Sequence, residues 1–432
     1  MSTRPKFAFV SSALPIAPNT PQAARSGLGL ILDRLLRCIP SERYCVITTL
    51  DRPPDALDAA YYFLKSHHMS LFSLEQTLST TVGISRARFY RPCLRWFRSA
   101  YRAGKRLAYS TMVANAEQPI KNRGHQIAKI AQRENCALIV GCSGELYDLP
   151  AAHRASQLTG IPFVAYILDY YGGGWRGSQG ALARRLEPAL LKDAAAVLVT
   201  NEHMADIYRR DYGVEAAIIR NPCVIPPPLP ADTPDPLLPS DTVNIVYTGA
   251  VYTAHYDAFH RLTAAIRALQ RSDVKLHIFT NNPPSVLALE GISGSEVVLH
   301  NYLPPERIVH VQQRADILFL PLAFHSDLPK MIATSAPGKT GEYLAAGRAV
   351  LVHAPSDSFL SWYFRQHACG AVADSEDIGL LTDTLRRLIG DAAWREQLGQ
   401  SARARAVADF DLAVVGPRFV NALETAAGVR FT

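Results

Sequence analysis

Residues 337–351 read Pro337-Gly338-Lys339-Thr340-Gly341-Glu342-Tyr343-Leu344-Ala345-Ala346-Gly347-Arg348-Ala349-Val350-Leu351. The run of helix formers after the proline and glycine stops at Gly347, and the apolar residues that follow predict a buried strand over 349–353. Backbone amides at a helix start favour anions, and Lys339 and Glu342 share one face of the first turns. A lysine there suits phosphate oxygens, and a carboxylate one turn deeper can accept both ribose hydroxyls. The pattern therefore predicts a sugar-nucleotide site.

This stretch resembles the donor-binding loop of GT-B glycosyltransferases, in particular the retaining family 4 with its proline, lysine and Glu-Tyr-Leu-Ala-Ala-Gly signature. Many members carry two glutamates eight positions apart. Glu342 matches the second, whereas Thr334 stands at the position of the first. Residues 335–339 match better a branch of this family that carries Ser-x-Pro-x-Lys before the glutamate. The resemblance implies donor-binding roles for Ser335, Gly338, Lys339, Thr340 and Glu342, and a catalytic role for Lys339 on the leaving diphosphate.

The segment from Ala333 to Thr340 also satisfies the permissive pattern of a nucleotide triphosphatase P-loop, with Gly-Lys-Thr at its end. A P-loop should follow its strand directly, and a second strand should end in an aspartate for magnesium. The candidate strands here end at Ala323 and His353. The context therefore favours the sugar-nucleotide interpretation.

Strand-like runs alternate with helical patterns through nearly the whole chain, which is typical of doubly wound α/β domains. We expect two Rossmann-like sheets facing across a cleft, which is the GT-B arrangement. The proline-dense segment 222–241 can form neither helix nor central strand and predicts the linker between them. The expected units are an acceptor-side domain over 1–221, a nucleotide-sugar domain over 242–410, and a tail over 411–432 that, by the resemblance, crosses back to the first domain. The expected strands cover 6–13, 44–50, 137–143, 163–169, 196–202, 215–221, 244–250, 275–281, 297–303, 317–323, 349–353 and 370–374.

The 432 residues carry a net charge of +7, and the excess comes from one segment. Eight of the 45 Lys and Arg residues lie between Gln76 and Ala116, where there is no acid. Within 86–106, aromatic and apolar residues recur at helical spacing beside an arginine stripe, a pattern typical of helices on anionic membranes. A helix packed on its own domain is the alternative, and no recognised nucleic-acid module accompanies the segment.

Composition predicts a cytoplasmic protein, peripheral to the inner membrane face if 86–106 binds lipid. The sequence has no apolar run of membrane-spanning length, and its start predicts a first strand rather than a signal peptide. The seven cysteines show neither Cys-x-x-Cys spacing nor the density of a disulfide framework, so we expect them to be reduced.

Several further residues are candidates for the donor side of the cleft. Gly249 ends a strand of the second domain and allows close approach of a ligand to the backbone. Similar transferases supply an arginine and a lysine from this loop. Here those positions hold Ala250 and Tyr256, which leaves Lys339, helix amides and His255 for the phosphates. We also expect Asn281 and Tyr302 to shape base and sugar specificity, and Arg25 to face the donor phosphate from the first domain.

On the acceptor side, Asp169 closes the strand over 163–169 and precedes an aromatic, glycine-rich loop. A carboxylate there is placed to hold sugar or acceptor hydroxyls, although a turn or N-cap role is the alternative. Glu145 follows another strand and is a second candidate. Its position breaks the Gly-x-Ser-x-Gly spacing of a hydrolase elbow, since it stands where the last glycine should be.

No metal site is predicted. Asp409-Phe410-Asp411 is the only Asp-x-Asp, and helix capping explains it; no His or Cys cluster has ligand spacing. We expect no cofactor beyond the nucleoside diphosphate sugar, and a transferase (EC 2.4 class) acting on a lipid-linked or cell-envelope glycan, with retention implied by the resemblance. A sugar-nucleotide epimerase of the same fold and a non-catalytic scaffold are the alternatives.

Overall fold

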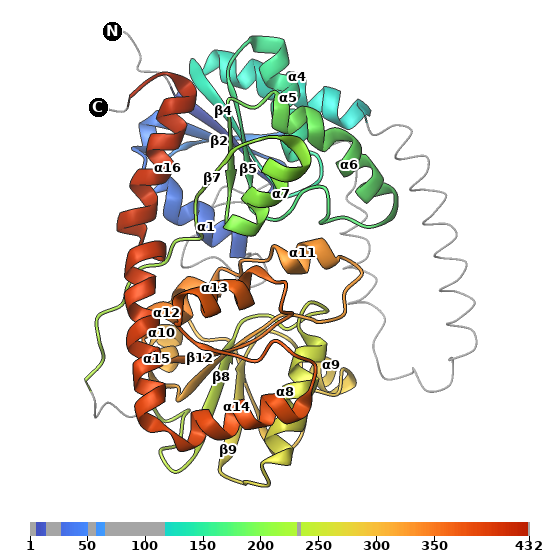
Figure 1. Ribbon diagram of the computed structural model, residues 1–432. Coiled ribbons are helices and arrows are strands. Elements are labelled where there is room, and N and C mark those ends of the chain that lie inside the picture. The colour runs from blue at the N-terminus through green and yellow to red at the C-terminus, as the bar shows by residue number, and fades with distance from the viewer. Residues whose placement is uncertain (1–5, 14–26, 51–57, 65–116, 231–234, 431–432) are drawn as a thin grey trace.

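The computed structural model describes residues 6–13, 27–50, 58–64, 117–230 and 235–430. They form two α/β domains, one above the other in Figure 1, each built on a wholly parallel sheet. Parallel strands need crossover connections, and helices supply these on both faces of each sheet. The expected fold class of two Rossmann-like domains is confirmed.

The first sheet has seven strands in the order β3-β2-β1-β4-β5-β6-β7. Their bounds are Lys6–Val10 (β1), Tyr44–Thr48 (β2), Ala60–Phe63 (β3), Cys136–Cys142 (β4), Phe163–Ile167 (β5), Ala196–Val199 (β6) and Ala216–Ile218 (β7). The helices that accompany them are α1 (Gly27–Leu36), the short 3-10 turn η2 (Ser41–Arg43), α4 (Glu117–Arg133), α5 (Asp148–Thr159), α6 (Gly177–Lys192) and α7 (Glu202–Tyr212).

The second sheet has six strands in the order β10-β9-β8-β11-β12-β13. They are β8 (Val243–Thr248), β9 (Val274–Phe279), β10 (Val297–His300), β11 (Ile317–Pro321), β12 (Ala349–His353) and β13 (Ala371–Val372). Their helices are α8 (Tyr256–Ala268), α9 (Pro284–Leu289), α10 (Pro305–Arg314), α11 (Pro329–Ala333), α12 (Lys339–Ala345), α13 (Phe359–His367), α14 (Ile378–Gly390) and α15 (Ala392–Arg405), followed by a π-turn (Ala406–Phe410) and α16 (Leu412–Ala427).

All twelve predicted strands are present: β12 has the predicted bounds, the other eleven end one to three residues earlier than predicted, and β4, β8 and β9 begin one residue earlier. The additional strand, β3, lies at the edge of the first sheet, where its residues are only partly buried. The P-loop pattern is excluded by position, because α11 and a turn separate it from β11. Six free cysteines lie among the described residues, while Cys93 lies outside them.

The chain passes between the domains twice, and the two crossings run side by side. The Cys223 N–H donates to the Phe410 carbonyl at 2.8 Å, and the Leu412 N–H donates to the Cys223 carbonyl at 2.9 Å. Helix α16 then packs on the first sheet (Figure 1), where Phe419 and Leu423 are fully buried. Burying two such side chains contributes roughly 3 to 6 kcal/mol to holding the helix in place.

Helix α16 begins at a capped residue. The Asp411 carboxylate accepts the Ala413 N–H at 3.0 Å, so the predicted capping role of Asp-x-Asp is confirmed for this aspartate. Asp409 instead accepts the Tyr363 hydroxyl at 2.6 Å. Among the residues that the structure describes, no helix is both long enough and apolar enough to cross a membrane.

Candidate functional site

Lys339 and Gly249 meet at the carboxyl edge of the second sheet. Gly249 directly follows β8 and has a φ of 119°, which only glycine adopts without strain. A Cβ atom on Gly249 would lie 3.1 Å from the Lys339 Nζ. The lysine at the start of α12 therefore passes over bare backbone, and a larger residue at position 249 would displace it.

The ammonium of Lys339 has no carboxylate at ion-pair distance among the described residues. Its Nζ donates to the Tyr247 Oη at 2.7 Å and lies 4.1 Å from the centre of that ring. The Tyr247 hydroxyl donates in turn to the Ala250 carbonyl at 2.6 Å. Surrounding protein atoms lower the pKa of Lys339 to about 7, opposed by the negative charge of Glu342. A desolvated cation without an acidic partner attracts an anionic ligand strongly.

Glu342 is tied to the first domain. Its Oε1 pairs with the Arg34 Nη2 of α1 at 2.9 Å, and the Arg34 Nη1 donates to the Pro222 carbonyl at 2.8 Å. Both charged side chains are mostly buried, with 22% and 30% of their surfaces exposed. A ribose at Glu342 would have to share or replace this contact, so the donor role of Glu342 stays a prediction.

The turn that leads into α12 is held by a hydrogen bond within the turn. The Thr340 N–H donates to the Pro337 carbonyl at 2.9 Å, and the Thr340 side chain is buried. The amide of Thr340 is thus occupied within the turn, and its buried hydroxyl has no hydrogen-bond partner among the described residues, so the donor role of Thr340 stays a prediction. Gly338 caps the helix and lies against α1, since a Cβ there would be 3.8 Å from Ile31.

Ser335 lies in a loop that first-domain amides hold from both sides. The Asn201 Nδ2 donates to the Thr334 carbonyl at 2.8 Å, and the Asn221 Nδ2 donates to the Ala336 carbonyl at 2.7 Å. Neither asparagine was predicted from the sequence to be a site residue. The sequence pattern can indicate Asn201 as the N-cap of α7, but it cannot indicate the contact of Asn201 with Thr334, which lies 133 residues away.

His255 does not supply charge to the site. It is buried, its ring lies 4.3 Å from that of Tyr252, and its Nδ1 is 3.4 Å from the Tyr247 hydroxyl. Burial and the nearby Lys339 ammonium hold the pKa of His255 well below its usual range. The imidazole is therefore neutral at physiological pH, so His255 could contact a phosphate only as a hydrogen-bond donor, and that role stays a prediction.

Asn281 and Tyr302 follow β9 and β10, at the same sheet edge as Gly249. Asn281 is exposed and Tyr302 half-buried, so both remain candidates for contacts with a base or sugar. The neighbour Asn282 holds the loop instead. Its side chain accepts the Val251 N–H and donates to the Val251 carbonyl, both at 2.9 Å.

Asp169 faces the second domain from the end of β5. Its negative charge contributes to the raised pKa of Tyr252, which follows β8, after the larger effect of burial. Burial also raises the pKa of Asp169 itself. The side chains of Asp169 and Tyr252 are exposed to solvent yet flanked by protein atoms, as is usual for groups that line a cleft. Among the described residues the Asp169 carboxylate accepts no hydrogen bond, so the alternative N-cap role is wrong.

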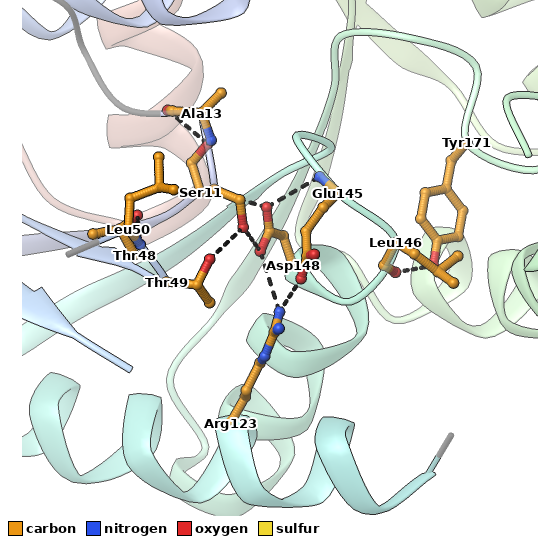
Figure 2. Close-up of polar contacts among 11 residues, drawn as sticks. Ser11, Ala13, Thr48, Thr49, Leu50, Arg123, Glu145, Leu146, Asp148 and Tyr171 are labelled. Carbon is orange, nitrogen blue, oxygen red and sulfur yellow. Dashed lines mark hydrogen bonds and ion pairs between the residues drawn. The ribbon is translucent and has the colours of Figure 1, made fainter. Parts of the chain in front are cut away.

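Glu145 belongs to a polar cluster at the ends of β1 and β4 (Figure 2). Its carboxylate pairs with Arg123 of α4, and its N–H donates to the Asp148 carboxylate at 3.2 Å. Asp148 is fully buried and accepts the Ser12 N–H at 2.7 Å and the Ser12 hydroxyl at 2.8 Å. Burial, and then the charge of Glu145, raise the pKa of Asp148 to about 7. The arginine pairing favours a structural role for Glu145 over catalysis.

Ser143, two residues before Glu145, is also structural. Its hydroxyl accepts the Leu168 N–H at 2.8 Å and so fixes the end of β5. This bond joins the β4 and β5 ends and determines where Asp169 emerges from the sheet.

The loop after Asp169 is fixed by a buried carboxylate. Glu187 of α6 accepts the Gly172 N–H at 2.9 Å, the Tyr208 hydroxyl at 3.1 Å and the Tyr212 hydroxyl at 2.7 Å. A Cβ on Gly172 would collide with the Glu187 carboxylate. Because three hydrogen bonds hold that carboxylate in the interior, it cannot rotate away.

We therefore expect Gly172→Ala to destabilise the protein by about 1 to 3 kcal/mol, the usual cost of overpacking a buried position. Urea unfolding followed by tryptophan fluorescence measures the loss. Gly390→Ala is the matched control, because nothing lies within 4 Å of a Cβ at that helix end, and its effect should stay within about 0.5 kcal/mol. Equal stability of the two variants would contradict the role assigned to Glu187.

Two predicted features lie outside the described residues: Arg25, as a donor-phosphate ligand, and the basic segment 86–106, as a membrane contact.

Comparison with known proteins agrees with the fold. Residues 66–227 match the model of the glycosyl transferase 4-like domain. No curated protein matches the chain by sequence. Among solved structures, a glycosyltransferase from Rickettsia africae is similar over 98% of both chains, with 12% identity and a TM-score of 0.64. The chain has the GT-B fold and resembles GT-B glycosyltransferases.

Two further GT-B structures are similar over nearly their whole length. The trehalose 6-phosphate synthase of Burkholderia multivorans has 12% identity and a TM-score of 0.61, covering 98% of this chain and 99% of that one. Anabaena HepE, solved with UDP and glucose, has 14% identity and a TM-score of 0.58, covering 98% of this chain and all of that one. At these identities the likeness concerns the fold.

Proposed function

We propose that this protein is a glycosyltransferase that moves a sugar from a nucleoside diphosphate sugar to an acceptor hydroxyl. The observation that carries the proposal is Lys339, whose ammonium lies over the bare backbone of Gly249 with no acidic partner among the described residues. The match to a glycosyl transferase 4-like domain supports it. The solved structure of HepE with UDP and glucose, a protein of the same fold, makes UDP-sugars the first donors to try.

The proposed chemistry is electrostatic. As the glycosidic bond to the diphosphate breaks, negative charge grows on the leaving oxygens, and a preorganised cation stabilises that charge more than it stabilises the ground state. Lys339 is that cation. Asp169, across the cleft, orients the incoming hydroxyl, and the leaving phosphate can take its proton. Domain closure would exclude water and limit hydrolysis of the donor.

The finer features of the proposal come from the sequence. The retaining outcome follows from the resemblance to family 4. A lipid-linked or cell-envelope glycan as acceptor, and a position on the inner face of the cytoplasmic membrane, follow from the arginine and aromatic pattern of 86–106.

A thermal-shift screen tests the donor site. UDP, GDP and their sugars are added to the wild type, to Glu342→Gln and to Arg34→Gln. At about 100 times the dissociation constant a ligand of the native state adds roughly 2.7 kcal/mol of stability, which is readily measured. If Glu342 binds the ribose, Glu342→Gln loses most of the nucleotide shift, whereas Arg34→Gln keeps or increases it because the competing ion pair is gone.

If Glu342 serves only the interdomain ion pair, both variants lose stability alike and show the same nucleotide shift as the wild type. No shift with any nucleotide would contradict the donor site and favour the scaffold alternative. Donor turnover separates the remaining classes. Donor consumption that rises with added acceptor supports transfer, and isomerised free donor supports the epimerase.

A further inference from the structure

A cavity of about 590 Å3 is lined by residues of both domains and includes Tyr170, the residue after Asp169. The first domain contributes the loop 170–177, Arg184 of α6 and Tyr212 of α7, and the second contributes residues 327–330 at the start of α11. Figure 1 shows α11 on the face of the second domain that meets the first. None of the donor-side candidates is among the residues that line this cavity.

The wall from the first domain is rigid. Glu187 fixes the backbone at Gly172, as described above. Gly173 is closed in as well, because a Cβ there would collide with the Tyr170 ring and lie 3.2 Å from the Lys330 Cβ. The packing of Gly173 against the Tyr170 ring holds that ring in place, Trp175 also lines the cavity, and preorganised aromatic walls reduce the entropy cost of binding.

The polar groups of the cavity are mainly basic. Arg176, Arg184 and Lys330 line it, with Asp327 as the single acid among the lining residues. Arg176 pairs with Asp327 at 3.3 Å on the surface. Arg184 has no ion pair among the described residues.

Lys330 is only loosely engaged. Its Nζ lies 3.9 Å from the Asp211 carboxylate and 5.8 Å from the centre of the Tyr170 ring. Arg184 and Lys330 are therefore available to a ligand. Two available cations beside aromatic rings suit a saccharide that carries an anionic group, because the rings stack on its apolar face and the cations take its charge.

We propose that this cavity binds the acceptor, and that the acceptor is an anionic sugar whose phosphate or carboxylate is held by Arg184 and Lys330. The inference rests on the proposed transferase function and on the position of Asp169, which immediately precedes the lining residue Tyr170 and whose charge acts on Tyr252 after β8. A sugar anchored by its charge in the cavity would direct a hydroxyl towards Asp169. A neutral sugar would leave the cations unused.

Calorimetric titration of the full-length protein tests the proposal. The probes are glucose 1-phosphate, glucuronic acid and glucose, each with and without saturating UDP or GDP, whichever gives the thermal shift. The nucleotide occupies the donor site, so phosphate binding there cannot be mistaken for binding in the cavity. The variants are Arg184→Gln, Lys330→Gln and their combination. Arg185→Gln is the control, since it removes an adjacent exposed charge of the same helix that does not line the cavity.

We expect at least one anionic sugar to bind, glucose to bind at least tenfold more weakly, and the double variant to weaken anion binding about tenfold or more. Arg185→Gln should bind like the wild type. Preference for glucose 1-phosphate identifies a phosphate ligand, and preference for glucuronic acid identifies a carboxylate. Anionic sugars that bind no better than glucose, or binding that the double variant leaves unchanged, would overturn the inference. The nucleotide shift, measured on the same samples, reports the donor site separately.

Discussion

Lys339→Met is expected to reduce sugar transfer by about two to three orders of magnitude, the usual effect of removing one preorganised group that stabilises developing charge. Methionine keeps the unbranched stem and removes the ammonium. The fold should persist, because the Tyr247 hydroxyl that accepts from Lys339 still donates to the Ala250 carbonyl. Initial rates at saturating donor, together with the dissociation constant for the nucleotide, measure the effect. Lys192→Met, at an exposed site on α6, is the control.

The same variant tests the charge state of the lysine. Burial lowers the pKa of Lys339 from 10.5 to about 7 in the folded protein, so between these values the unfolded chain binds more protons than the folded one. Stability therefore rises with pH through this window, and the ammonium opposes folding below it. We expect Lys339→Met to melt at a higher temperature than the wild type at pH 6.5, and the difference to shrink by pH 9.

Nucleotide binding should show the opposite pH dependence. The diphosphate prefers the protonated lysine, so affinity falls as the pH rises through about 7, and binding takes up protons. Calorimetry in buffers of different ionisation enthalpy counts those protons. Two results would contradict the role of Lys339: a transfer rate in Lys339→Met equal to that of the wild type, or a wild-type nucleotide affinity that does not change with pH.

The sequence predicted the sheets well because their interior strands are continuous apolar runs, which periodicity detects. It missed β3, whose residues Ala60–Phe63 lie at a partly solvated edge and give a weaker signal. Lys339 and Gly249 were both identified as donor-side residues, since each stands at a recognisable strand or helix boundary. Their contact across 90 residues depends on the pairing of β8 with β11 and could not be read from either segment.

Tertiary packing gives several candidate residues surroundings that the sequence does not show. His255 stands in the loop after β8, and burial together with the nearby Lys339 ammonium holds its pKa well below the usual range. Thr340 stands at a helix start, and there the Pro337 carbonyl already accepts its backbone N–H. The partner of Glu342, Arg34, lies 308 residues earlier, and local pattern carries no information on such a pairing.

Asp169→Asn is expected to lower transfer by about 100-fold or more, within the range for loss of a group that positions or accepts a proton. The exchange preserves shape and removes only charge. Because the Asp169 carboxylate accepts no hydrogen bond among the described residues, it is not fixing a turn, and we expect the melting temperature to be nearly unchanged. Asp241→Asn, at an exposed site before β8, controls for the loss of one negative charge.

The pH profile separates a chemical role for Asp169 from a structural one. Burial raises its pKa above the ordinary value for aspartate, and only the ionised form can orient and accept from a hydroxyl. Wild-type transfer should therefore be lost as the pH falls through this raised pKa, at a higher pH than an ordinary aspartate would give. The Asn variant should have a low rate without that acid limb, and its nucleotide-induced thermal shift should equal that of the wild type. If the loss of activity at low pH persists in Asp169→Asn, another group causes it. If Asp169→Asn transfers sugar at the wild-type rate, Asp169 has no role in catalysis.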